Sequence, residues 1–299
     1  MSTTAIPLLY NPVAGRGRAG RLAPSIVQEF ESRGLKIDLI ASTGVGDLER
    51  KVHELAASGA TQIVLAGGDG SIHEAANGIL ASGSNASLGI VPVGTGNDFA
   101  KSIATPLEWR QATAQLAIRI RNAEPCRTVD AGKMNSRFFI NGAGIGFDAK
   151  INNIAKKYQW PIGDLVYLFA VFEGLWDGVV TPNVHIRYGT VEYEGPITLA
   201  NISNGPWVGG MFRIAPMADV SDGQFDLILA EPMSRARILG LLPKLIRGTH
   251  LGHAGLRHVQ VRDFSLEADA PLPSHLDGES QPLQTAFNAQ ILPAALKII

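Results

Sequence analysis

Short apolar runs alternate with longer amphipathic segments along the first hundred residues. The runs have the length of buried strands, whereas the segments between them repeat apolar residues at helical spacing. This βαβα order predicts a mainly parallel sheet with helices on both faces. The expected strands span 7–10, 36–40, 62–66 and 87–91, and the expected helices span 18–33, 46–58 and 72–81. We therefore predict an N-terminal Rossmann-like α/β domain over residues 1–128.

The pattern changes after about Arg127. Short runs of apolar and β-branched residues are now separated by turns that contain Gly, Pro, Asn and Asp, which is typical of antiparallel strands. The runs span 137–141, 183–188, 190–193, 197–202, 224–229 and 259–265, and helices are expected at 149–176 and 234–247. We predict a mainly antiparallel β-sandwich domain over residues 129–287, and we expect residues 288–299 to return to the first domain.

Composition narrows the class of protein. The 299 residues are 45% hydrophobic and 18% charged, and the formal net charge of −1 argues against a nucleic-acid partner. The single cysteine, Cys126, excludes an intrachain disulfide and favours a reducing compartment. The N-terminus has no secretory pattern, and the apolar stretch 162–176 is shorter than the ~20 residues that span a bilayer. We expect a cytoplasmic protein.

A glycine-rich segment follows the expected strand at 62–66. It reads Gly67-Gly68-Asp69-Gly70-Ser71 and leads into a helical segment. A strand, a glycine turn and a helix place backbone N–H groups and the positive end of a helix dipole at one point, which attracts phosphate. Asp69 fits such a turn if a divalent cation joins its carboxylate to the phosphate. A dinucleotide-binding turn, with Asp69 as a helix cap, is the alternative.

A second glycine-rich segment follows the expected strand at 87–91. It reads Val93-Gly94-Thr95-Gly96-Asn97-Asp98-Phe99-Ala100. Thr95 and Asn97 offer short polar side chains beside glycines, which suits hydrogen bonds to phosphate or nucleotide. Because adjacent parallel strands end at the same sheet edge, two such loops together indicate a nucleotide site more strongly than either one alone.

Several segments together resemble the diacylglycerol kinase catalytic domain, in particular bacterial soluble lipid kinases related to sphingosine and ceramide kinases. They occur in the family's order from Asn11 to Glu279. The resemblance implies a fold like that of NAD kinase and diacylglycerol kinase, and an ATP-dependent, Mg²⁺-requiring lipid kinase with a role in phospholipid biosynthesis. The matching segments are Asn11-Pro12…Gly15, Gly67-Gly68-Asp69-Gly70-Ser71…Glu74, Pro92…Gly94-Thr95-Gly96-Asn97-Asp98-Phe99-Ala100, Asn141…Gly144…Gly146…Asp148, Asp222-Gly223 and Leu276-Asp277-Gly278-Glu279.

The resemblance and the loop chemistry assign the nucleotide-binding residues. A further hydroxyl contact falls on Ser42 or Thr43, because the spacing to Gly46 favours the first and the residue type favours the second. Two residues depart from the family pattern: Ser71 stands where threonine is more frequent, and His73 stands where asparagine is usual. The other expected nucleotide-binding residues are Gly67, Gly68, Asp69, Gly70, Ile72, Gly94, Thr95 and Asn97.

The family also has a metal site at an Asp-Gly turn of the second domain. Its ligand spacing falls here on Asp219, Asp222 and Gln224, with backbone carbonyls expected from the first and last. Oxygen ligands of this kind suit Mg²⁺ or Ca²⁺. A plain Asp-Gly hairpin turn explains the same residues equally well.

Phosphoryl transfer to a hydroxyl also needs a group that accepts the proton. By resemblance this group is Glu279, with Asp69 near the phosphates and Mg²⁺ and with Asp277 organising metal or water. Without the resemblance, Asp-Gly-Glu is an ordinary surface turn. His275 is more often structural in such a place.

The basic, apolar segment 234–247 is the expected contact with an anionic membrane surface, although a helix packed on the sandwich with a solvated basic face has the same pattern. The expected partner is a lipid substrate at the inner face of the membrane, and an edge strand allows a homodimer. An NAD kinase or a phosphofructokinase-like sugar kinase is the alternative enzyme, since both use a Gly-Gly-Asp-Gly loop. A nucleotide or lipid sensor without turnover is the third interpretation.

Overall fold

The computed structural model describes residues 5–158 and 165–299. The chain forms two compact units, Met1–Val129 with Ala294–Ile299, and Asp130–Pro293. The first boundary differs by one residue from the predicted one. The chain returns to the first unit at Ala294 and not at about residue 288, because the last strand stays paired within the second unit for most of its length.

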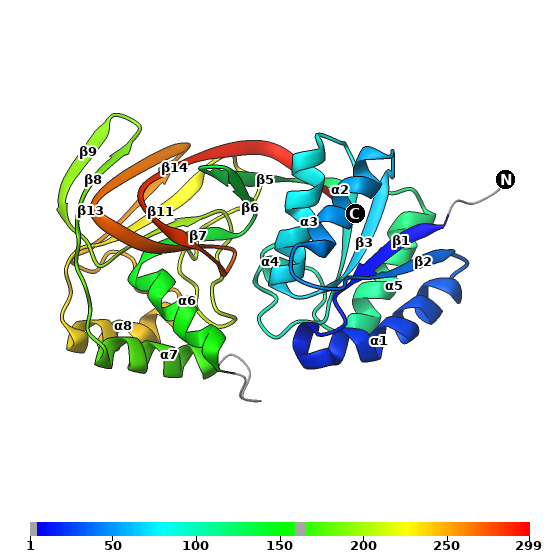
Figure 1. Ribbon diagram of the computed structural model, residues 1–299, viewed down its shortest axis with the longest axis horizontal. Coiled ribbons are helices and arrows are strands. Elements are labelled where there is room, and N and C mark those ends of the chain that lie inside the picture. Colours follow the sequence, from blue (N-terminus) through cyan, green and yellow to red (C-terminus); the bar gives the residue numbers. More distant parts are fainter. Residues whose placement is uncertain (1–4, 159–164) are drawn as a thin grey trace. The chain divides into compact units, whose positions relative to one another are not determined.

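A parallel sheet forms the centre of the first unit (Figure 1). Its strands are ordered β2-β1-β3-β4, and the end of β14 runs parallel beside β4, where Lys297 and Ile298 pair with Ser87 and Leu88. This confirms the predicted mainly parallel α/β architecture. The strands are β1 (Ile6–Tyr10), β2 (Ile37–Ala41), β3 (Gln62–Gly67), β4 (Ser87–Pro92) and β14 (Glu279–Ile298).

Helices cover this sheet in two packed pairs, α1 with α5 and α2 with α3. Leu8, Val64 and Val91 of the strands form a core with Phe30 of α1 and Leu116 of α5. The helices are α1 (Ala14–Glu31), α2 (Asp47–Ala57), α3 (Asp69–Ser82), α4 (Asp98–Ser102) and α5 (Trp109–Arg121).

Two helix starts concern the candidate site. The backbone of residues 15–17 is left-handed, so the regular part of α1 begins after Gly17, close to the predicted start at residue 18. Helix α3 begins at Asp69, three residues before the predicted start. Gly68 is its N-cap, so residues 69–71 form the first turn. The N–H groups of a first turn have no acceptor inside the helix.

The second unit is built from antiparallel strands, which confirms the predicted β-sandwich class. The path runs β12-β11-β10-β7-β13-β14, with β8 beside β13, β9 beside β8, and β5 and β6 paired to each other. Phe225, Phe264 and Phe287 lie in its core. The strands are β5 (Arg127–Met134), β6 (Arg137–Phe139), β7 (Gly142–Gly146), β8 (Asn183–Tyr188), β9 (Val191–Pro196), β10 (Leu199–Ser203), β11 (Phe225–Ala230), β12 (Leu256–Val261) and β13 (Asp263–Leu276).

Three helices belong to this unit. The segment expected as one helix at 149–176 contains α6 (Phe147–Lys157) and α7 (Leu165–Trp176), and residues 159–164 lie outside the described part of the chain. The third helix, α8 (Arg235–Arg247), is capped by the Ser234 side chain, which accepts a hydrogen bond from the Arg237 N–H. In the described residues, no helix has the length and apolar character needed to cross a membrane.

Candidate active site

The two glycine-rich loops of the first unit lie against each other. They follow the adjacent strands β3 and β4, and the Val93 N–H donates to the Gly67 carbonyl at 3.0 Å. A Cβ added to Gly94 would lie 2.5 Å from the Gly68 Cα, and one added to Gly68 would lie 2.8 Å from the Gly94 Cα. Both positions therefore need glycine for the loops to come together.

The start of α3 lies in the first of these loops. The first α-helical hydrogen bond runs from the Ile72 N–H to the Gly68 carbonyl at 2.9 Å. The N–H groups of Asp69, Gly70 and Ser71 come before it and have no acceptor within the helix. Together with the helix dipole, these N–H groups suit a bound phosphate.

Asp69 joins the two loops. Its Oδ1 accepts a hydrogen bond from the Phe99 N–H at 3.2 Å, so it holds the start of α4. Burial, and next the charge of the Asp98 carboxylate, raise the pKa of Asp69 to about 7, although backbone N–H groups at 97–99 oppose the shift. A divalent cation would favour ionisation of the two neighbouring carboxylates, of which Asp98 also lies 3.7 Å from Lys101 Nζ, and carboxylate oxygens are ligands that Mg²⁺ prefers.

The polar residues of the second loop differ in exposure. Asn97 is buried and left-handed, and its side chain accepts from the Gly94 N–H at 3.1 Å and donates to the Gly94 carbonyl at 3.0 Å. Thr95 is exposed. Asn97 therefore shapes the loop, whereas Thr95 is accessible from solvent.

The remaining expected nucleotide residues are mostly buried. Ile72 and His73 lie inside α3, and the Asn77 amide donates to the His73 carbonyl at 3.0 Å. Buried side chains present few atoms to a ligand, so these two support the turn. Ser42 is buried after β2, whereas the Thr43 hydroxyl donates to Asp47 Oδ2 at 3.0 Å. The hydrogen bonds to Lys51, Arg50 and Thr43 lower the pKa of Asp47.

The expected metal turn of the second unit is held by its own hydrogen bonds. Asp219 Oδ1 accepts from the Ser221 N–H at 3.0 Å, and Asp222 Oδ1 accepts from the Gln224 N–H at 2.9 Å. Burial, and then nearby carboxylates, raise the pKa of Asp222. Residues 5–158 and 165–299 contain no group of three or more His, Cys, Asp or Glu side chains placed to hold a metal ion. A site with backbone carbonyl ligands stays a prediction.

The Asp-Gly-Glu segment is a tight hairpin turn between β13 and β14. Asp277 and Gly278 both have positive φ, and Leu276 pairs with Glu279 across the turn. The Asp277 carboxylate accepts from the backbone N–H groups of three consecutive residues, at 3.0 Å from Ile140, 2.8 Å from Asn141 and 3.0 Å from Gly142. Asp277 thus fixes the turn to the strand beside it.

The expected base, Glu279, stands at the exit of this turn. Its side chain is half-exposed, and its Oε2 lies 2.6 Å from Nζ of Lys156 on α6. The carboxylate is open to solvent, and a lysine holds it in a defined direction. The exposure of the carboxylate leaves it accessible to a substrate hydroxyl group, as a proton acceptor must be.

Two family models match the chain. The diacylglycerol kinase catalytic domain covers residues 5–134, and the YegS C-terminal NAD kinase beta sandwich-like domain covers residues 142–299. A diacylglycerol kinase of Mycobacterium tuberculosis is 30% identical over 98% of this chain and 94% of its own, and one of Bacillus subtilis is 29% identical over 91% and 88%. The chain belongs to the diacylglycerol kinase family.

The fold is shared with solved structures. A diacylglycerol kinase from Bacillus anthracis superimposes with a TM-score of 0.74 at 21% identity and covers 100% of this chain and 97% of its own. A second structure from that organism gives a TM-score of 0.82 at 23% identity over 100% and 98%. The two superpositions show a shared fold.

The structure also shows residues of this diacylglycerol kinase family member that the sequence did not single out for a role. His275 is buried, its Nδ1 accepts the Gly278 N–H at 3.2 Å, and its Nε2 lies 3.4 Å from Asp148 Oδ2. The Asn201 amide donates to the same oxygen at 2.8 Å. Asp148 lies in a segment that matched the family, but its partnership with His275 spans 127 positions, so no local pattern points to it.

Proposed function

We propose that the protein transfers the γ-phosphoryl group of ATP to a hydroxyl group of a lipid, diacylglycerol or a close relative, with Mg²⁺ as cofactor. The names of the curated relatives support the lipid acceptor. The observation that supports the nucleotide part is the position of Asp69 between the two glycine-rich loops, where burial and the Asp98 charge raise its pKa to about 7. The free N–H groups at the start of α3 suit a phosphate, and the Asp69 carboxylate suits a metal ion. A nucleotide bound together with a metal ion supplies both.

In this proposal, the loops bind the phosphates through backbone N–H groups at the start of α3. Asp69 and Asp98 would hold Mg²⁺, which neutralises phosphate charge during transfer. The Thr95 hydroxyl, and that of Thr43 or Ser42, would add hydrogen bonds to the nucleotide. Glu279 accepts the proton of the lipid hydroxyl, while Asp277 and Lys156 hold the turn and the carboxylate in place.

The proposal is tested with γ-labelled ATP, Mg²⁺ and mixed micelles of diacylglycerol, monoacylglycerol, phosphatidylglycerol, ceramide or a sphingoid base. NAD and fructose 6-phosphate serve as control acceptors. Asp69→Asn and Glu279→Gln should each lower kcat by about 10²–10⁴-fold. Asp38→Asn and Glu267→Gln, at exposed positions on β2 and β13, should leave it unchanged.

Label in one lipid, lost in both site variants while they stay folded, would support the proposal and name the substrate. Label in NAD or in the sugar would contradict the proposal of a lipid acceptor but would leave the proposed ATP site unaffected. Binding of ATP without transfer to any acceptor would favour a sensor.

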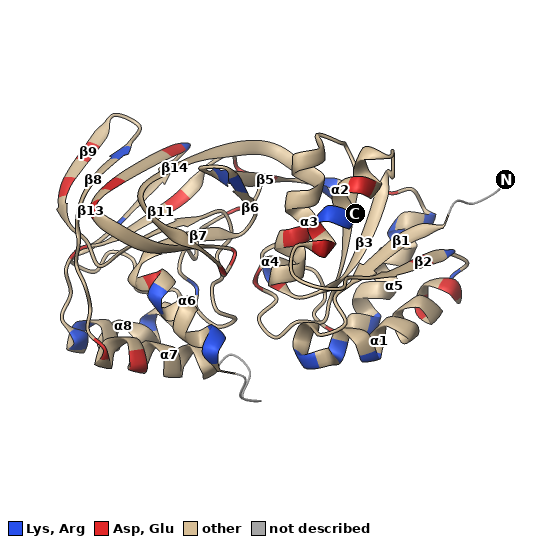
Figure 2. Ribbon diagram, in the orientation of Figure 1, with Lys and Arg blue, Asp and Glu red and all other residues tan. Residues whose placement is uncertain are grey.

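We also propose that the second unit contacts the membrane through α7 and α8. Residues 165, 169, 172 and 176 share one face of α7 at helical spacing; three of them are about half-exposed and Trp176 is 85% exposed. Helix α7 packs in one apolar cluster with α6 and α8. Lys and Arg residues lie on these two neighbours (Figure 2). An apolar stripe beside basic helices matches an anionic lipid surface.

Sedimentation with vesicles tests this contact. Phe172→Ser with Trp176→Ser should weaken binding to phosphatidylglycerol-containing vesicles by about tenfold or more, since two exposed aromatic side chains no longer enter the interface. Leu283→Ser changes another exposed apolar residue, on β14, and should have no effect. Equal binding of all three proteins would contradict the assignment.

A further inference from the structure

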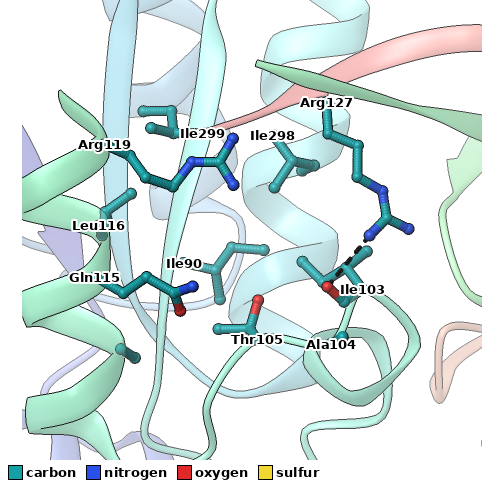
Figure 3. Close-up of a pocket in the computed structure, with 11 residues that line it drawn as sticks. Ile90, Ile103, Ala104, Thr105, Gln115, Leu116, Arg119, Arg127, Ile298 and Ile299 are labelled. Carbon is teal, nitrogen blue, oxygen red and sulfur yellow. Dashed lines mark hydrogen bonds between the residues drawn. The ribbon is translucent and has the colours of Figure 1, made fainter. Parts of the chain in front are cut away.

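A cavity lies in the first unit, away from the residues of both glycine-rich loops. Its volume is about 80 Å³, and it is bounded by β4, by the residues that follow α4, by α5 and by the last residues of the chain (Figure 3). Ile90 and Ile298 line it from the sheet. The volume corresponds to roughly two to three water molecules, which is too small for a nucleotide or an acyl chain.

Two guanidinium groups face this cavity. Arg119 comes from α5 and Arg127 from the start of β5, and Figure 3 shows them on either side of Ile298. Arg127 donates to the Ile103 carbonyl at 3.3 Å. Arg119 donates through one terminal nitrogen to the Pro125 carbonyl at 3.0 Å. Each bond uses one of the five N–H donors of a guanidinium, so both groups retain donor capacity.

The charge at the cavity is positive. Within the described residues, the buried Arg119 Nε has no hydrogen-bond partner, and its ion-pair neighbour is the Glu124 carboxylate at 3.8 Å. One carboxylate at this distance does not balance two guanidinium groups. A buried N–H without an acceptor costs free energy, and an anion in the cavity would remove this cost.

Polar side chains complete the lining. Thr105 and Gln115 place a hydroxyl and an amide at the cavity (Figure 3). Ala104 just before Thr105 is left-handed, with φ 55°, and the Thr105 N–H donates to the Ala100 carbonyl at 2.9 Å. The turn after α4 thus holds a strained, non-glycine residue at the cavity wall. Strain of this kind persists where the surroundings fix it, often at ligand sites.

We propose that this cavity binds a small tetrahedral oxyanion of the phosphate class, either the free ion or the phosphomonoester group of a lipid headgroup. Planar guanidinium groups form paired hydrogen bonds with phosphate oxygens, and Thr105 and Gln115 supply further donors. The site is separate from the proposed ATP site in its residues. Helix α4 lies between them in sequence: its first turn is held by Asp69, and the residues after its end line the cavity.

Calorimetric titration of the full chain with inorganic phosphate, at saturating ADP to occupy the glycine-rich loops, tests the proposal. Arg119→Gln and Arg127→Gln should each weaken phosphate binding at least tenfold. Arg121→Gln removes an exposed guanidinium from the same helix, outside the cavity, and should bind within twofold of wild type. The Arg119 Nε–H resonance should shift on titration, because the anion becomes its acceptor. Thr105→Val gives a second test if an arginine variant fails to fold.

A parallel titration with glycerol 3-phosphate separates the two sources of the anion. Binding as tight as that of phosphate assigns the site to a headgroup, and binding of phosphate alone assigns it to the free ion. The proposal is overturned if no saturable binding occurs, or if the lining variants bind as wild type does, which would place the anion elsewhere.

Discussion

Asp69 and Asp277 are both aspartates beside a glycine in a tight turn, yet their surroundings differ. Asp277 accepts hydrogen bonds from three consecutive backbone N–H groups, so its charge is compensated by the protein. Asp69 is partly buried near a second carboxylate, and its pKa rises to about 7. Asp277 therefore maintains the turn, whereas Asp69, whose ionised form is disfavoured by its surroundings, is the carboxylate that a bound cation would stabilise. Neither the residue type nor the number of backbone donors decides between these roles, since the N–H groups of residues 97–99 also act on Asp69; burial and the neighbouring Asp98 carboxylate make the difference.

The largest effect is expected from Asp277→Ala. The change leaves the N–H groups of Ile140, Asn141 and Gly142 without their acceptor and places alanine at φ 50°. We expect a loss of about 2–4 kcal/mol of unfolding free energy, measured by urea denaturation. Asp277→Asn keeps an acceptor oxygen and tolerates the left-handed backbone, so it should lose less than half as much. Equal stability of the alanine variant and wild type would show that these bonds do not hold the turn.

The next effect concerns the contact between the glycine-rich loops. Gly94→Ala places a Cβ 2.5 Å from the Gly68 Cα and 2.8 Å from Asn97 Oδ1, so the loops must separate. ATP affinity measured by calorimetry should fall about 10–100-fold. Gly240→Ala adds a Cβ on α8 that meets no atom within 4 Å, and a gain of about 0.5–1 kcal/mol in stability is expected there. If Gly94→Ala binds ATP as wild type does, close packing of the loops is not required.

The charge of Asp69 should appear in the pH dependence of stability. Its folded pKa of about 7 lies above the ordinary 3.8, so the folded chain binds this proton more tightly than the unfolded chain. Stability therefore falls as pH rises from about 4 to 7. Relative to Asp69→Asn, which has no such proton, wild type should lose about 1–3 kcal/mol between pH 5 and 8.

Urea unfolding with EDTA present measures this difference. Asp38→Asn on β2 serves as a control that should keep the wild-type dependence of stability on pH. Asp98 and Lys101 face the same region as Asp69 and stay unchanged in both variants. Addition of Mg²⁺ should reduce the fall if the cation binds at Asp69. Parallel curves for wild type and Asp69→Asn would contradict the raised pKa.

The sequence predicts the parts of the molecule in which the information is local. Glycine, a preceding apolar run and a following helix are contiguous around Gly67 and Gly94, and the structure places both loops together as expected. Strand β7 was not predicted because three of its five residues are glycine, which disfavours strands. It forms because β10 and β13 pair with both of its edges. The run 259–265 was expected as one strand but belongs to two, β12 and β13.

Site residues whose partners lie far along the chain were not predictable in the same way. Lys156 and Glu279 meet across 123 positions, and each looks like an ordinary surface charge in its own segment. Asp130 accepts from the Gly223 N–H across 93 positions. The packing of α6 against β13 and the pairing of the strands in the second unit bring such residues together, and neither can be predicted from the local sequence pattern.

The smallest effect is expected at the pair of the partly buried Asp148 and the buried His275. This pair extends the comparison to a carboxylate whose charge is compensated by a side chain and not by backbone N–H groups. Burial opposes ionisation of Asp148, but the His275 ring and the Asn201 amide outweigh it, and the pKa of Asp148 lies below its ordinary value. Such a group stabilises the fold above its unfolded pKa and loses this contribution as pH falls through the folded pKa. His275→Phe removes the ring nitrogens, so acid unfolding should begin at higher pH, as measured by near-ultraviolet circular dichroism.

The same ring holds the turn that carries Glu279, because its Nδ1 accepts the Gly278 N–H. In His275→Phe we expect kcat of phosphoryl transfer to fall about 3–10-fold with little change in KM, since the proposed proton acceptor, Glu279, is less well positioned. His275→Asn places an oxygen near the former Nδ1 and should recover part of kcat, but not the acid stability that depends on Asp148. Recovery of both by asparagine would show that the contact with Asp148 contributes nothing and that the hydrogen bond to Gly278 is the whole role of the ring.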